Sequence, residues 1–123
     1  MNKDPFVLRK RILLAESEPS VRGAINAALR LDEHTVIEAG NPGELLRLCA
    51  SDQFDLLIVD ADFDKSGERS TLAAIRRVAP SQRVLLITAN LASRFPEKDH
   101  QELILDKPFT LARLRQAISE LLK

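Results

Sequence analysis

Four short runs of apolar residues lie along the chain, and each ends at a polar or charged side chain. Unbroken apolar runs, separated by segments with helical spacing, are typical of parallel strands buried on both faces. A shorter and less apolar run at residues 35–39 suits the edge of the same sheet. The four runs are residues 12–15 before Glu16, 56–59 before Asp60, 84–87 before Thr88, and 103–105 before Asp106 and Lys107.

Helix start signals lie between the apolar runs. Pro19 suits a first helical position, and we expect Ser17 to cap this helix. Asn41 is a second candidate cap, followed by a proline and by Glu44 three residues later. Thr110 is placed to cap the last helix. Apolar stripes at helical spacing lie in three segments between or after the apolar runs: Val21, Ile25, Ala28 and Leu29; Leu72, Ile75, Val78 and Ala79; Leu111, Leu114, Ile118, Leu121 and Leu122.

This alternation predicts an α/β fold with a doubly wound, five-stranded parallel sheet in the order 2-1-3-4-5. The polar segment 90–101 contains Pro96, so we expect the fourth helix to be shortened or irregular. A length of 123 residues indicates one domain. We place this domain at residues 11–123, after a lead-in at residues 1–10.

Composition narrows the classes of function. Lys and Arg together number 18, as do Asp and Glu, so no net charge attracts nucleic acid or a membrane surface. We find no signal peptide and no apolar stretch of membrane-spanning length. We interpret the single Cys49 as a core residue, and a lone cysteine is consistent with a reducing cytoplasm. His34 and His100 form no triad or metal cluster, and we expect both in exposed loops.

The polar residues that follow the strands would bring several functional groups together at one edge of the sheet. Ligands of open α/β sheets bind beyond the carboxyl ends of the strands. Glu16, Asp60, Thr88 and Lys107 would place two carboxylates, a hydroxyl and an ammonium group there. Such a set suits a phosphoryl group and a metal ion. A nucleotide-binding enzyme would need a glycine-rich loop after the first strand, whereas residues 16–19 are acidic and contain no glycine.

With these residues, the chain resembles the receiver domain of bacterial two-component response regulators. The resemblance rests on segments 12–22, 55–60, 86–89 and 106–109, and it covers nearly all of residues 11–123. It implies that Asp60 accepts a phosphoryl group from a histidine kinase or a phosphotransfer protein. Thr88 and Lys107 would contact that group.

The resemblance also implies how such a protein would act. It would signal by contact with a further protein target, and a homodimer through the last strand and helices is one arrangement that receiver domains use. No enzymatic activity is expected beyond self-phosphorylation and autodephosphorylation of Asp60.

The chain departs from the receiver pattern at two positions. Receiver domains carry two adjacent acids after the first strand, whereas Ser17 follows Glu16 here. We therefore expect Mg²⁺ to bind weakly, through Glu16, Asp60 and the backbone carbonyl of Asp62. Ile104 stands at the position where receivers carry an aromatic switch residue.

These departures leave two functions open. The chain is either a phosphorylated receiver or a pseudo-receiver that binds a partner without Mg²⁺-dependent phosphorylation. The first is favoured by Asp60, Thr88 and Lys107. The second is favoured by Ser17 after Glu16, by Ile104 and by the irregular segment 90–101. Phe63 has three open interpretations: an exposed contact, a lid over the site, or packing into the sheet edge.

Overall fold

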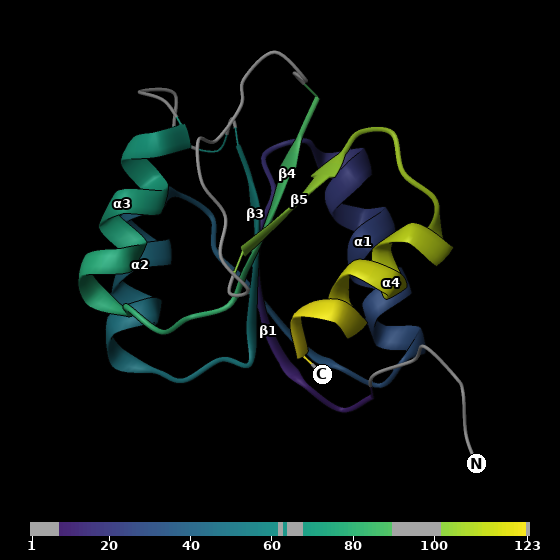
Figure 1. The fold of residues 1–123 in the computed structure, drawn as a ribbon, viewed down its shortest axis with the longest axis horizontal. Helices are drawn as coiled ribbons and strands as arrows, with labels where there is room; N and C mark the ends of the chain where they lie inside the picture. Colours follow the sequence, from purple (N-terminus) through teal and green to yellow (C-terminus); the bar gives the residue numbers. More distant parts are fainter. Residues whose placement is uncertain (1–7, 62, 64–67, 90–101, 123) are drawn as a thin grey trace.

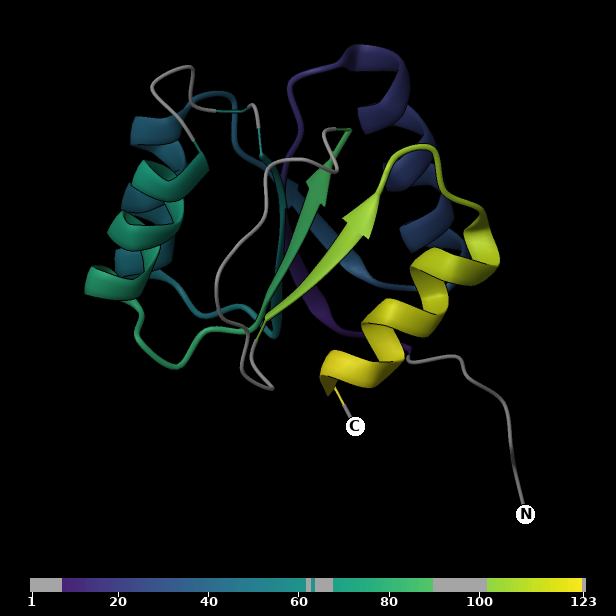
Figure 2. The ribbon, with the colours of Figure 1, turned by 45° about the horizontal axis from the view of Figure 1, so that its top comes forward.

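The structure, a computed structural model, describes residues 8–61, 63, 68–89 and 102–122. Helices α1 and α4 cover one face of a parallel sheet, and α2 and α3 cover the other (Figures 1 and 2). The strands, in the order β2-β1-β3-β4-β5, and the helices are β1 (Arg11–Ala15), β2 (Thr35–Glu38), β3 (Leu56–Asp60), β4 (Val84–Thr88), β5 (Glu102–Asp106), α1 (Pro19–Leu31), α2 (Pro42–Ser51), α3 (Glu68–Val78) and α4 (Leu111–Leu122).

This architecture confirms the predicted fold class and strand order. The weakly apolar run at residues 35–39 forms β2 at one edge, as expected. The segment 90–101, for which a short or irregular helix is predicted, lies outside the described residues. No helix within the described part of the chain is long and apolar enough to span a membrane.

Local sequence signals set two of the helix starts. The Asn41 side chain accepts a hydrogen bond from the backbone N–H of Glu44 at 2.8 Å, and the Glu44 side chain accepts one from Gly40 at 2.7 Å. Thr110 accepts a hydrogen bond from the N–H of Arg113 at 3.1 Å at the start of α4. The bonds from the N–H groups of Glu44 and Arg113 satisfy backbone donors that a helix leaves without internal partners, as the sequence predicts.

Alternation along the strands divides the core into two layers. Side chains at successive strand positions point to opposite faces of a sheet. In β3, Ile58 packs in the layer beneath α1 and α4, and Val59 packs in the layer beneath α2 and α3. Phe63 joins the second layer and is only 9% exposed, which settles its open interpretation in favour of packing. Cys49 lies in the same layer, where burial raises the pKa of its thiol to about 11.

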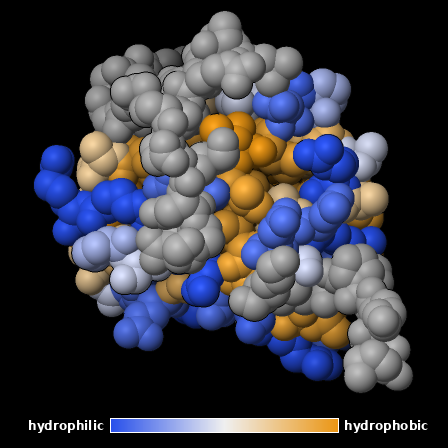
Figure 3. Space-filling model, in the orientation of Figure 1, coloured by the Kyte–Doolittle hydropathy of each residue, from blue (hydrophilic) through white to orange (hydrophobic). Residues whose placement is uncertain are grey.

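On the face of the molecule seen in Figure 3, apolar side chains gather near the centre, and hydrophilic side chains lie around them. Two ion pairs tie surface elements to each other. Arg115 of α4 donates two hydrogen bonds of 2.8 Å to Asp32, just beyond α1. Arg76 of α3 reaches Glu102 of β5 at 2.8 Å. These contacts hold α4 against α1, and α3 against the edge strand.

His34 departs from its predicted environment. We expected an exposed loop histidine, but His34 is 4% exposed. Its Nδ1 accepts a hydrogen bond from the backbone N–H of Lys10 at 2.9 Å. This contact joins the lead-in to the start of β2, which explains why a polar ring is buried there. Burial lowers the pKa of His34 below its ordinary 6.5, although the charge of Asp32 opposes the change.

We predict that the free energy of unfolding falls as the pH drops below about 6.5, because the unfolded chain then binds a proton that native His34 resists. His34→Asn retains a side-chain acceptor and cannot titrate, so its loss of stability between pH 7.5 and 5.5 should be smaller. Urea unfolding followed by circular dichroism measures both proteins. Equal pH dependence would contradict the prediction, since His100 is present in both.

Candidate functional site

Three strand ends bring the central side chains together. Ala15 of β1 pairs with Val59 of β3, so the next residues, Glu16 and Asp60, lie side by side where these two strands end. The backbone N–H of Lys107 donates to the carbonyl of Thr88 at 2.8 Å, which extends the β4–β5 pairing by one residue. Alternation along β3 and β5 carries the side chains of Asp60 and Lys107 to the α1–α4 side of the sheet.

The two oxygens of Asp60 have different surroundings. The carboxylate is buried, with 3% of the residue exposed. Its Oδ2 accepts a hydrogen bond of 2.6 Å from the Ser17 hydroxyl and a longer one of 3.4 Å from the Ser17 backbone N–H. Its Oδ1 lies 3.6 Å from the ammonium nitrogen of Lys107. One oxygen therefore faces a neutral donor, and the other faces a cation.

The contact of Ser17 corrects the sequence prediction. We expected Ser17 to cap α1, but Glu18 occupies the N-cap position and its side chain makes no capping hydrogen bond. Pro19 takes the first helical position, so the cap must be the residue just before it. That spacing was a signal in the sequence, and it places Ser17 one residue outside the helix.

Glu16 is the most deeply buried acid of the site, with a side chain that is 0% exposed. Its Oε2 accepts hydrogen bonds of 3.1 Å from the backbone N–H of Glu18 and from the Lys107 ammonium group. Its Oε1 is buried without a hydrogen-bond partner among the described residues. Burial raises the pKa of Glu16, the negative charge of Asp60 adds to this, and the two donors to Oε2 oppose it.

Lys107 holds the two carboxylates together. Burial by itself lowers the pKa of its ammonium group, but the hydrogen bond to Glu16 and the charges of Asp60 and Glu16 outweigh burial and raise it. Lys107 is therefore a stable cation with its side chain 16% exposed. Within the described residues, its ion pairs are with Glu16 and Asp60. The peptide bond that follows Lys107 is cis.

Two further predicted site residues belong to the other face of the sheet, and a third is not described. Thr88 is buried, with 3% exposed, at the end of β4, where it pairs with Asp106 of the next strand. Ile104 is half-buried against the layer beneath α2 and α3. The strand alternation places Thr88 on the same side as Ile104. Asp62 lies outside the described residues.

The donor set fits a magnesium ion, with fewer charges than three acids would supply. Mg²⁺ prefers hard oxygen ligands, and the buried Oε1 of Glu16 offers one beside Asp60. Ser17 contributes a neutral hydroxyl at the place of a further carboxylate. Among the described residues, no three His, Cys, Asp or Glu side chains group around one point as a metal site.

A comparison with known protein families agrees with the geometry of this site. The profile of the response regulator receiver domain matches residues 12–119. The chain belongs to this family. Receiver domains bind Mg²⁺ in the active site, and they are signalling domains rather than enzymes. No curated protein matches the chain significantly.

Solved structures share the receiver fold. The response regulator TrrA of Thermotoga maritima, solved in complex with Mg²⁺-BeF, has 25% identity and a TM-score of 0.79, over 92% of this chain and 99% of that one. The receiver domain of the sensor histidine kinase PA1611 of Pseudomonas aeruginosa, with magnesium in its active-site cleft, has 22% identity and a TM-score of 0.75, over 93% and 97%. The response regulator PhyR of Brucella abortus has 22% identity and a TM-score of 0.79, over 96% and 49%.

We predict opposite changes in the pKa of Glu16 in two variants. Asp60→Asn removes a neighbouring negative charge and should lower it, whereas Lys107→Met removes a donor and a positive charge and should raise it. A ¹³C NMR titration of the Glu16 side-chain carboxyl group measures both. A shift in the same direction in both variants would show that these charges do not control Glu16.

Proposed function

We propose that this receiver domain accepts a phosphoryl group on Asp60 from a histidine kinase or a phosphotransfer protein, and signals through contacts with a further protein. The main support is the 3.6 Å approach of the Lys107 ammonium group to Oδ1 of Asp60, beyond the carboxyl end of a central strand. A nucleophilic oxygen beside a fixed cation is what phosphoryl transfer requires.

The transfer uses groups that the site contains. Oδ1 of Asp60 attacks the phosphorus of a phosphohistidine, the bond between phosphorus and the imidazole nitrogen breaks, and the imidazole leaves as the transferred group binds Asp60. Lys107 neutralises negative charge on the phosphoryl oxygens. Glu16 and Asp60 would hold a Mg²⁺ ion, which supplies further positive charge to those oxygens.

The second candidate function is a pseudo-receiver that binds its partner without Mg²⁺-dependent phosphorylation. It is favoured by Ser17, which replaces an acid beside Asp60, and by Ile104, which cannot act as an aromatic switch. The two functions differ in whether Asp60 reacts. They agree in a protein partner and in a cytoplasmic location, with residues 11–123 as the domain and 1–10 as its lead-in. A homodimer through β5 and α4 remains compatible with both.

We predict that beryllofluoride, a mimic of the phosphoryl group, shifts the backbone amide NMR signals of Glu16, Asp60, Thr88 and Lys107 in the presence of Mg²⁺. The chain has no tryptophan, so NMR replaces a fluorescence assay. Asp60→Asn lacks the nucleophilic carboxylate and should show no such shifts. Acetyl phosphate should add one phosphoryl group to the parent and none to this variant, as measured by intact mass. An unreactive parent at millimolar Mg²⁺ would favour the pseudo-receiver.

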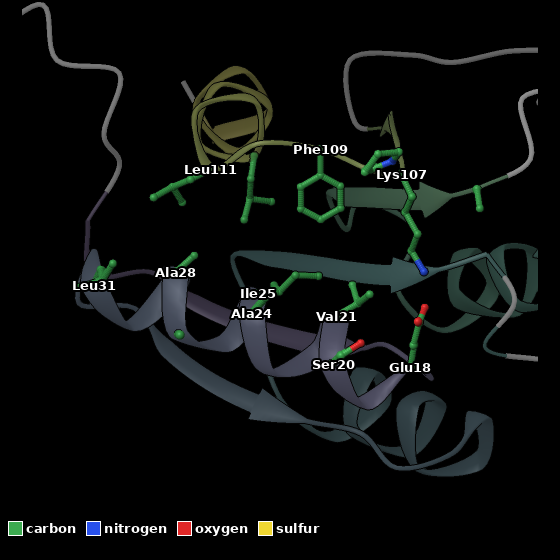
Figure 4. Close-up of a pocket in the computed structure, with 14 residues that line it drawn as sticks. Glu18, Ser20, Val21, Ala24, Ile25, Ala28, Leu31, Lys107, Phe109 and Leu111 are labelled. Carbon is green, nitrogen blue, oxygen red and sulfur yellow. The ribbon is translucent and has the colours of Figure 1, made fainter.

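A groove beside the site offers a docking surface for the phosphoryl donor. It lies between α1 and α4, with a volume of about 740 Å³, and its lining is largely apolar. Figure 4 shows Glu18 and Lys107 at one end, and Leu31 and Leu111 toward the other. Leu31 is 69% exposed, which is unusual for a large apolar side chain. Because the groove leads to Lys107, a donor helix lying in it would bring its phosphohistidine to Asp60.

We predict that Ala24→Arg, an exposed position in this groove, lowers phosphoryl transfer from the donor protein by about tenfold or more, because a charge would enter an apolar contact. Phosphorylation by acetyl phosphate should not change. Gly23→Arg is the matched control, since it adds the same charge to α1 at a position outside the groove with open space around it. Equal loss of transfer in both variants would contradict this docking surface.

A further inference from the structure

The Ser17 hydroxyl makes a short hydrogen bond to Asp60. Its 2.6 Å hydrogen bond ends on Oδ2, and the Ser17 backbone N–H lies 3.4 Å from the same oxygen. The Lys107 ammonium nitrogen lies 3.6 Å from the other carboxylate oxygen, Oδ1. Ser17 therefore gives the two oxygens of one carboxylate separate roles.

We propose that Ser17 is a positioning residue that occupies Oδ2 of Asp60 in place of a cation, so that it both weakens Mg²⁺ binding and lets Asp60 react when Mg²⁺ is scarce. This inference rests on the proposed phosphorylation of Asp60 and adds the regulation of that site by the metal. It assigns Oδ1 as the attacking oxygen.

Competition for one oxygen is the first step of the argument. A short hydrogen bond to a carboxylate is among the stronger polar contacts in proteins. Oδ2 has two lone pairs, and both the Ser17 hydroxyl and the Ser17 backbone N–H approach it. A cation that uses Oδ2 as a ligand therefore competes with a Ser17 donor, and it gains no charge from Ser17 in return. Ser17 thus reduces Mg²⁺ affinity in two ways, by competing for the oxygen and by lacking a carboxylate of its own.

Charge balance is the second step. The described acids in direct contact with Lys107 are Glu16 and Asp60. Two carboxylates and one ammonium group leave less repulsion for an incoming phosphoryl group than three carboxylates would. The Ser17 donor lowers the negative potential further at Oδ2. Asp60 can therefore meet the phosphoryl group with Lys107 as the main cation.

The test compares Ser17→Ala, Ser17→Thr and Ser17→Asp with the parent in the full chain. One arm titrates MgCl₂ alone and follows backbone amide shifts near Glu16 and Asp60. The other arm titrates beryllofluoride, once with EDTA and once with excess Mg²⁺. Far-UV circular dichroism checks that every variant is folded, and Ser17 is exposed enough for all three changes.

For Ser17→Ala, the Mg²⁺ affinity and the beryllofluoride affinity should change in opposite directions. Its Mg²⁺ affinity should rise several-fold, because Oδ2 loses its competitor, whereas its beryllofluoride affinity in EDTA should fall by about tenfold. Ser17→Thr keeps the hydroxyl and should behave like the parent. Ser17→Asp should bind Mg²⁺ at least about tenfold more tightly and require it for beryllofluoride.

Weaker or unchanged Mg²⁺ binding in Ser17→Ala would overturn the proposal, as would the absence of Mg²⁺ binding in Ser17→Asp. An equal requirement for Mg²⁺ in the parent and in Ser17→Ala would also overturn it. The MgCl₂ arm involves no phosphoryl chemistry. A parent that ignores beryllofluoride under both conditions, with the Mg²⁺ affinities ordered as expected, would contradict the proposed function and the reaction at scarce Mg²⁺, and would support the weakening of Mg²⁺ binding by Ser17.

Discussion

The site depends on one constraint, the burial of two carboxylates around a single ammonium group. Glu16 and Asp60 are both nearly inaccessible to water, and Lys107 contacts each of them. A buried charge without a partner is strongly destabilising, so the removal of Lys107 would leave two of them. The fold must therefore hold the end of β5 beside β3. It does so through β4, which pairs with both strands, and through the backbone bond from Lys107 to Thr88.

Ser17 changes the electrostatics of this cluster without breaking it. A further carboxylate at this position would leave the cluster short of positive charge in the absence of a metal ion. The hydroxyl instead donates to Oδ2 of Asp60 without adding a charge, so that two carboxylates, rather than three, face the Lys107 ammonium group. The Oε1 of Glu16 remains buried, with no hydrogen-bond partner among the described residues. This oxygen is one that a metal ion could use as a ligand.

Most of the fold could be predicted from the sequence, because the signals are local and repeated. Each strand is an apolar run with a polar end, and the Asn41 cap with Glu44 marks its helix directly. The grouping of Glu16, Asp60 and Lys107 follows from parallel strands that end at one edge. The sequence could not predict which carboxylate oxygen contacts which donor, because this depends on how far each side chain extends toward the neighbouring strands.

Two errors have the same origin. Ser17 was interpreted from its neighbours in sequence as a cap, yet its hydroxyl partner lies 43 positions away on β3. His34 was interpreted as an exposed loop residue from its polarity, yet its ring accepts a backbone hydrogen bond from a residue 24 positions earlier. In both cases a polar side chain has a distant partner that only the folded chain supplies. For His34, polarity by itself predicts exposure, and the long-range hydrogen bond reverses that prediction.

The buried cluster also bears on the choice between the two functions. A module that only binds a partner gains nothing from two buried acids and a lysine, since well-packed apolar residues in their place are often neutral or stabilising. The cluster at the strand ends includes an aspartate whose Oδ1 faces a cation, beside a groove that leads to the same lysine. The proposed phosphoryl transfer would use all three features at once. In this proposal Ser17 changes only the metal requirement, and it leaves the nucleophile Asp60 and the cation Lys107 in place.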